Sequence, residues 1–158
     1  MRTRATRSVF RLETRRRYSN PSERESPEAC PAGEPEVGLD DSGWNDFIRA
    51  KVADGVRWDE VHVCRGPLTD HERWALESPC ADTERAGRRL YVLDLAEVAE
   101  PPGLPDYDYW THDESSVVRM LYDEDGKHPG NERLPDVEVA AHPVYWRENR
   151  ARTGDRAG

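Results

Sequence analysis

Cysteine, lysine and long apolar runs are scarce in this sequence of 158 residues. It has only three cysteines, Cys30, Cys64 and Cys80, and no two of them have CxxC spacing. An odd number without that spacing favours neither a zinc cluster nor a disulfide framework. No run approaches about 18 apolar residues, and the basic start lacks the apolar centre of a signal peptide. We therefore expect a cytoplasmic protein without a membrane span.

Lysine is also nearly absent, since only Lys51 and Lys127 occur beside 21 arginines. The arginines are unevenly placed: residues 1–20 carry a local charge of +6, residues 21–43 carry −6, and the remainder carries −9. A body this acidic does not suit a general nucleic-acid binder, which needs a basic face. We expect no nucleic-acid contact except a weak one through the Arg-rich N-terminal arm.

Composition divides the chain into tails and a body. Residues 19–43 contain four prolines and three glycines among scattered acids, without an apolar period, which is typical of a linker. We expect residues 1–43 to be a poorly ordered tail, residues 44–152 to be a single globular domain, and residues 153–158 to be a disordered end. Within the tail, residues 10–18 either dock on the body as a short strand or remain frayed.

The body begins with a helix and a strand. The apolar residues within 44–52 have helical spacing and predict a helix of about three turns, which Ser42 caps and Gly55 ends. Residues 56–64 are rich in β-branched and aromatic side chains and predict a strand. Their alternation slips near Glu60, which indicates a bulge.

A capped helix and a second strand follow. Thr69 and Glu72 match a capping box, and the helix that they open must end by Pro79. Residues 88–95 are an apolar run without alternation, which suits a strand covered on both faces. Strand, capped helix and strand therefore form the predicted centre of the fold, with a right-handed crossover if the strands are parallel.

Hairpins are predicted after that unit. Residues 107–112 and 117–122 form the first, and a turn at 123–126 leads to a short edge segment that ends near Leu134. A final helix is expected to begin at Asp136. The predicted fold class is α+β, with a mixed or antiparallel sheet, a strand–helix–strand unit, a C-terminal hairpin and flanking helices.

Metal binding finds little support in the sequence. His62 and Cys64 share a strand face, but two ligands are too few for a site. A calcium loop that started at Asp123 would have Lys127 and Leu134 where oxygen ligands are needed. We predict no bound metal and no cofactor.

Catalytic motifs are incomplete. Cys64 ends a predicted buried strand, where a thiol is usually a core residue. The enzyme hypothesis that remains is a small hydrolase or nucleotide-acting enzyme, using His112 with the hairpin-end carboxylates Asp113 and Asp123.

A cluster of Arg, Trp and Asp residues near strand ends is the more informative feature. Loops at strand ends collect binding groups, and Trp and Arg favour protein interfaces. The alternative is that the tryptophans fill the core and the charges form ordinary surface pairs. The predicted binding surface consists of Arg65, Asp70, Arg73, Trp74, Asp106, Asp108, Trp110, Asp113 and Arg119.

Four strings carry a family resemblance: FRLETRRRY at 10–18, VHVCRGPLTDHERWALE at 61–77, LPDYDYWTHD at 104–113 and VVRMLYDEDG at 117–126. In this order they resemble an uncharacterised actinobacterial domain of unknown function that is commonly encoded beside XRE-type helix-turn-helix regulators. The resemblance implies a non-catalytic binding or signalling module whose partner is such a regulator. It supplies no catalytic residues.

Overall fold

The computed structural model of the chain describes residues 5–16, 42–77 and 84–134. These residues form one mixed sheet of order β3-β2-β1-β4-β5-β6, together with two helices. The α+β class and the mixed sheet are therefore confirmed. The elements in chain order are β1 (Ser8–Glu13), α1 (Ser42–Ala53), β2 (Arg57–Cys64), α2 (Asp70–Glu77), β3 (Arg89–Asp94), β4 (Tyr109–His112), β5 (Ser116–Leu121) and β6 (Gly130–Leu134).

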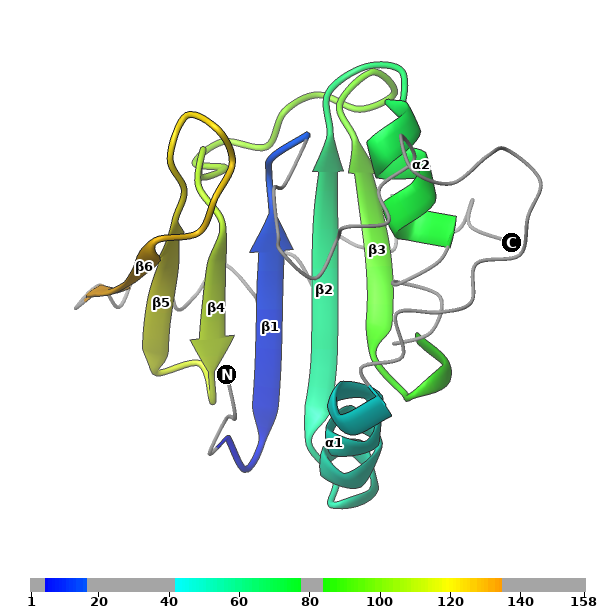
Figure 1. Cartoon of the computed structure of the whole chain (residues 1–158), viewed down its shortest axis with the longest axis vertical. Helices are drawn as coiled ribbons and strands as arrows, with labels where there is room; N and C mark the ends of the chain where they lie inside the picture. Colours follow the sequence, from blue (N-terminus) through cyan, green and yellow to red (C-terminus); the bar gives the residue numbers. More distant parts are fainter. Residues whose placement is uncertain (1–4, 17–41, 78–83, 135–158) are drawn as a thin grey trace.

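Half of the sheet is parallel. β1, β2 and β3 point the same way, and both α1 and α2 lie in front of them in Figure 1. With the helices in front and the strands pointing up, β2 lies to the right of β1 and β3 to the right of β2, which is the right-handed crossover. The predicted strand–capped helix–strand unit is thus confirmed. In the other half, β1 pairs with β4, β4 with β5 and β5 with β6, and all three pairings are antiparallel.

The N-terminal strand lies inside the sheet. β1 pairs with β2 on one side and with β4 on the other, and Leu12 at its centre is 0% exposed. Of the two alternatives for residues 10–18, docking is the one that the structure shows for the described part of that segment. The sheet thus includes residues 8–13, which precede the boundary expected at residue 44.

The end of α1 and the start of α2 are as their sequences predict. At the end of α1, Gly55 has a φ of +85°, its amide donates to the Val52 carbonyl at 2.9 Å, and the Val56 amide donates to the Lys51 carbonyl at 3.0 Å. This pair of bonds is a Schellman motif, which needs a left-handed residue. At the start of α2, the capping box forms as expected: the Glu72 amide donates to Thr69 Oγ1 at 3.1 Å.

The bulge expected in β2 is wrong. Pairing with β1 and with β3 runs without interruption through Glu60. Alternation slips because Glu60 occupies a buried position, 1% exposed, on the face that also carries Trp58 and His62. In the sequence pattern, a charged residue at a core position therefore looks the same as a bulge.

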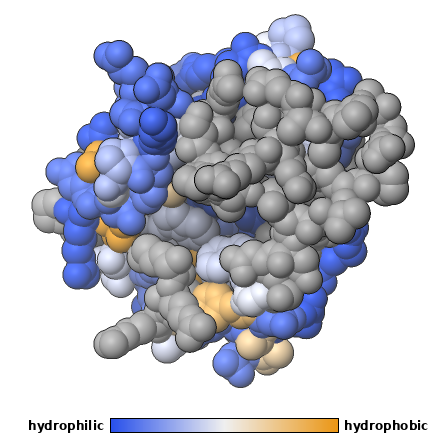
Figure 2. All heavy atoms as spheres, in the orientation of Figure 1, coloured by the Kyte–Doolittle hydropathy of each residue, from blue (hydrophilic) through white to orange (hydrophobic). Residues whose placement is uncertain are grey.

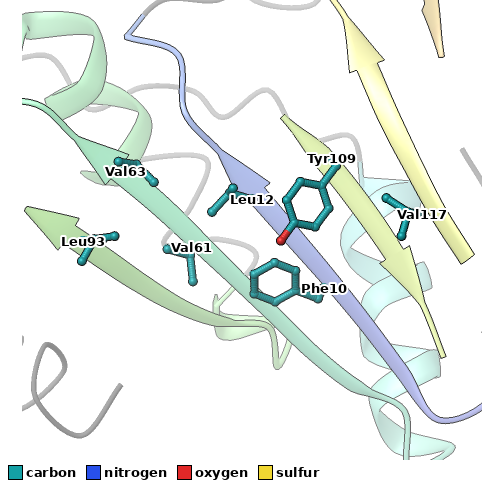
Figure 3. Close-up of a cluster of buried hydrophobic side chains, with 7 residues drawn as sticks. All are labelled: Phe10, Leu12, Val61, Val63, Leu93, Tyr109 and Val117. Atoms are coloured by element: carbon teal, nitrogen blue, oxygen red, sulfur yellow. The ribbon is translucent and has the colours of Figure 1, made fainter. Parts of the chain in front are cut away.

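Each face of the sheet has its own apolar core. On the helix-bearing face, Ile48 of α1 packs with Trp58, and the rings of Trp44 and Trp110 meet Trp58 edge-on at 5.6 and 6.2 Å. Three tryptophans therefore belong to this core. Figure 3 shows the core of the opposite face, whose side chains come from β3, β2, β1, β4 and β5. That core consists of Phe10, Leu12, Val61, Val63, Leu93, Tyr109 and Val117.

Two tight turns complete the antiparallel half. Asp113 and Glu114 both have positive φ, 53° and 59°, between β4 and β5, as predicted for a hairpin turn. Asp123 Oδ1 accepts from the amides of Asp125 and Lys127 at 3.0 and 2.8 Å, which is ordinary turn chemistry. The helix expected from Asp136 lies outside the described residues.

The outer surface agrees with the hydrophilic composition. In Figure 2 the described residues on the viewed side are mainly hydrophilic, with a few hydrophobic side chains among them. Leu68 and Leu121 are exposed large hydrophobic residues, at 37% and 36%. Among the described residues, no helix has both the length and the apolar character needed to cross a membrane.

Candidate functional site

One end of the sheet gathers part of the predicted binding surface. The carboxyl ends of β1, β2 and β3 lie there, and β4 begins there, because Tyr109 pairs with Leu12 near the end of β1. Arg65 follows β2 directly, and its Nη1 lies 2.7 Å from Glu100 Oε2. The residues that the structure brings to this end near the surface are Arg65, Asp70, Arg73, Trp74 and Asp106, all exposed except the half-buried Trp74.

The other four predicted residues are placed differently. Asp108 is at the same end but is buried, where it accepts from the amide and hydroxyl of Thr14 at 2.7 and 2.8 Å. Trp110 packs in the core beside α1. Asp113 lies at the opposite end of the sheet. Arg119 lies on the face away from the helices, opposite Tyr109, and its guanidinium is 4.6 Å from the Tyr107 ring centroid. Of these four residues, Trp110 fits the alternative in which the tryptophans fill the core. Asp108 and Asp113 accept hydrogen bonds from the N-terminal segment instead of forming surface ion pairs.

The hairpin-end groups of the enzyme hypothesis are not brought together. His112 and Asp113 precede β5, and Asp123 follows it. Six residues of strand span roughly 17–20 Å at about 3.3 Å per residue. No reacting atom can contact all three side chains across that distance.

Asp113 has a structural role instead. Its Oδ1 accepts from the amides of Arg7 and Ser8 at 2.7 and 3.0 Å, and its carboxylate also accepts from the amide of Thr6. Burial raises the pKa of Asp113, but these amide hydrogen bonds outweigh burial and hold the pKa below its usual value. The carboxylate thus fixes the point where the chain enters β1.

A group of ionisable side chains that the sequence patterns did not indicate lies on the helix-bearing face of the sheet. In the register of β1 and β2, Glu13 stands opposite His62 and Arg11 stands opposite Glu60, and Arg88 comes just before β3. Glu60, Arg88 and Glu13 are 1%, 5% and 7% exposed. We call Arg11, Glu13, Glu60, His62 and Arg88 the buried ion network.

Contacts within the buried ion network are specific to single atoms. His62 Nε2 lies 2.6 Å from Glu13 Oε2 and 2.6 Å from Glu60 Oε1. The second oxygen of Glu13 pairs with Arg11, and the second oxygen of Glu60 pairs with Arg88. Each carboxylate is therefore held between one guanidinium and the same imidazole nitrogen.

Electrostatics keeps both glutamates ionised. Burial raises the pKa of Glu13, but Arg11 and His62 more than offset it and leave the pKa well below its usual value. Burial and the like charge of Glu13 raise the pKa of Glu60, but Arg88, His62 and Arg11 together lower it below its usual value. Because each carboxylate is ionised and bound to an arginine, neither is free to act as a general acid or a strong general base.

Cys64, next along the same face, is not an activated nucleophile. It is a free, buried cysteine, and burial together with the negative charge of Glu72 raises its pKa to about 11. Its thiol is therefore protonated at neutral pH, when only a thiolate reacts readily. Glu72 itself is tied to Arg16, whose Nη2 lies 3.2 Å from Glu72 Oε2 and 2.6 Å from the Pro67 carbonyl oxygen.

Metal ligands converge at one place in the described part of the chain. Ligand atoms of Glu13, Glu60 and His62 all lie within 4.8 Å of one another. In the sequence His62 was considered with Cys64, its neighbour on the strand face, whereas the structure surrounds it with two glutamates. The signal for this cluster was the slip in alternation at Glu60.

Comparison with known protein families gives a match over nearly the whole chain. No curated protein matches it in sequence. A family model described as a domain of unknown function, DUF6879, matches residues 1–154. That match includes all the described strands and helices, so the chain belongs to the DUF6879 family.

Proposed function

We propose that this protein is a non-catalytic interaction module that works with a helix-turn-helix transcriptional regulator. The observation that carries the proposal is the gathering of Arg65, Asp70, Arg73, Trp74 and Asp106 at one end of the sheet. They come from two segments distant in sequence, and their combination of Arg and Trp is typical of protein interfaces. We call these five residues the sheet-end surface.

The distribution of ionisable groups supports the non-catalytic part of the proposal. His112 and Asp113 are separated from Asp123 by the whole length of β5. Glu13 and Glu60 have arginine partners, and the Cys64 thiol is protonated at neutral pH. The Cys64 thiol is therefore not an activated nucleophile, and neither glutamate is a free base.

The identity of the partner rests on the family resemblance. Domains with the same order of strings are commonly encoded beside XRE-type regulators, and adjacent genes often encode proteins that act together. Such regulators act in the cytoplasm, which is where we propose that this chain works. The exposed Leu68, between Pro67 and the start of α2, adds apolar area beside the sheet-end surface.

A co-purification experiment tests this function. The tagged full chain should retain the regulator encoded beside it, and the double variant R65E/R73E should lose at least tenfold in affinity. The matched control R49E/R133E reverses the same charges at exposed positions on α1 and β6 and should bind as the wild type does. Absence of any binding by the wild type, or equal losses in both variants, would contradict the proposal.

A further inference from the structure

We propose that Glu13, Glu60 and His62 bind one divalent transition-metal ion of the zinc type, which ties β1 to β2. The three donor atoms, Glu13 Oε2, Glu60 Oε1 and His62 Nε2, face one another. Glu13 belongs to β1, whereas the other two ligands belong to β2. An ion at this point would therefore join the N-terminal strand to the strand beside it.

Arginines orient the carboxylates for this role. Arg11 pairs with Glu13 Oε1 and Arg88 pairs with Glu60 Oε2, so each glutamate directs its other oxygen toward His62. Partners of this kind, bound to the atom that does not face the ion, commonly fix metal ligands in position. Both carboxylates are thus preorganised to bind through one oxygen.

A count of protons also favours a cation. Both carboxylates are paired with arginines and carry no proton, so the imidazole Nε2 supplies at most one hydrogen. One N–H cannot form two well-aligned hydrogen bonds, yet both carboxylate oxygens lie 2.6 Å from this nitrogen. A metal ion bound by the lone pairs of all three atoms would satisfy them together.

The kind of ion follows from the donors. One imidazole nitrogen and two carboxylate oxygens suit Zn²⁺, with bonds of about 2.0–2.2 Å, whereas Mg²⁺ prefers six oxygens. Tetrahedral bonds of that length place donors about 3.3 Å apart, so each 2.6 Å contact needs to lengthen by less than about 1 Å. Three protein ligands leave a coordination position for water.

Charge limits the affinity. Two arginines and two glutamates in the buried ion network cancel, so the bound ion adds its full charge to a buried region. We therefore expect weaker binding than in a structural site with four protein ligands.

Zinc titration of the full chain, after treatment with a chelator, tests the proposal. We expect one equivalent of Zn²⁺ to bind and to raise the melting temperature by several degrees, and Mg²⁺ to do neither. The variants E13Q and H62Q should weaken binding at least tenfold. H128Q, at an exposed histidine outside the buried ion network, should bind as the wild type does.

A second measurement does not depend on whether the variants fold. Anomalous diffraction from wild-type crystals soaked in Zn²⁺ should place the ion within about 2.2 Å of His62 Nε2 and of both carboxylates. Zinc found only at other histidines, or no stoichiometric binding in solution, would overturn the proposal. Neither result would affect the test of the sheet-end surface, which uses other residues.

Discussion

Glu60 is a carboxylate at 1% exposure in the middle of a strand, and its burial is sustained by its neighbours. Taking a charge out of water costs several kcal/mol, which only close partners of opposite charge can offset. Arg88 pairs with one oxygen and His62 contacts the other. Removal of one member therefore leaves another buried charge with less compensation.

Substitution of Glu60 by Gln should destabilise the protein strongly. Since Arg88 would keep its burial and lose its ion pair with Glu60, we expect the free energy of unfolding to fall by about 3–5 kcal/mol. Denaturant unfolding with and without chelator measures this loss. E132Q is the control, because the Glu132 side chain is 52% exposed and lies 3.9 Å from Arg119; it should cost less than about 1 kcal/mol.

The double variant E60L/R88L completes this comparison. Because it removes both charges of the pair, it should cost less than E60Q alone, as is common when a buried pair becomes apolar. A loss for E60Q as small as the loss for E132Q would mean that the buried ion network contributes no more than a surface pair.

Sequence alone contained part of this site. The broken alternation at Glu60 was visible, but its explanation as a bulge was wrong. Glu60 is separated from Glu13 by more than 40 residues and from Arg88 by more than 20, and their contact depends on which strands are neighbours. A charged residue at a core position indicates that it has partners of opposite charge, but the sequence does not show which residues these are.

Individual helices and turns were more predictable than the site, because their signals are local. Thr69 and Glu72 form the predicted capping box, and Gly55 has the left-handed backbone expected of a helix stop. The turn at Asp113 was also predicted. Its contact with the residues before β1 was not, because it joins positions more than 100 residues apart.

That contact makes a prediction about pH. The pKa of Asp113 is lowered in the folded protein, so its stabilising contribution is complete above the usual value of 3.8 and is lost as pH falls through the lower folded pKa. Wild type should therefore be more stable than D113N at pH 7, and the difference should shrink below about pH 3.8. Urea unfolding of both proteins from pH 7 to pH 3 measures this.

D106N serves as the control for the pH series, because Asp106 is exposed in the loop before β4. It should follow the wild type at every pH. A difference between wild type and D113N that stays constant from pH 7 to pH 3 would show that the carboxylate charge is not what holds the entry to β1.

For the molecule as a whole, the central position of β1 in the sheet follows from the burial of its side chains and not from the composition of the N-terminal region. Arginines and a Pro-rich stretch made the N-terminal region resemble a tail, yet Val9, Phe10 and Leu12 are 1%, 4% and 0% exposed. Val9 faces one core and the other two face the opposite core. A strand buried on both faces belongs in the interior of a sheet. Three apolar residues among arginines were too short a pattern to predict this.

Removal of residues 1–13 should therefore abolish cooperative unfolding, because β2 and β4 would lose the strand that joins them. A peptide of residues 5–16 added in trans should restore the native near-ultraviolet dichroism and a cooperative transition. The same peptide with Leu12→Asp should not, since that side chain is 0% exposed and a buried unpaired charge is costly. Cooperative unfolding of the shortened chain alone, at the wild-type midpoint, would show that β1 is dispensable to the sheet.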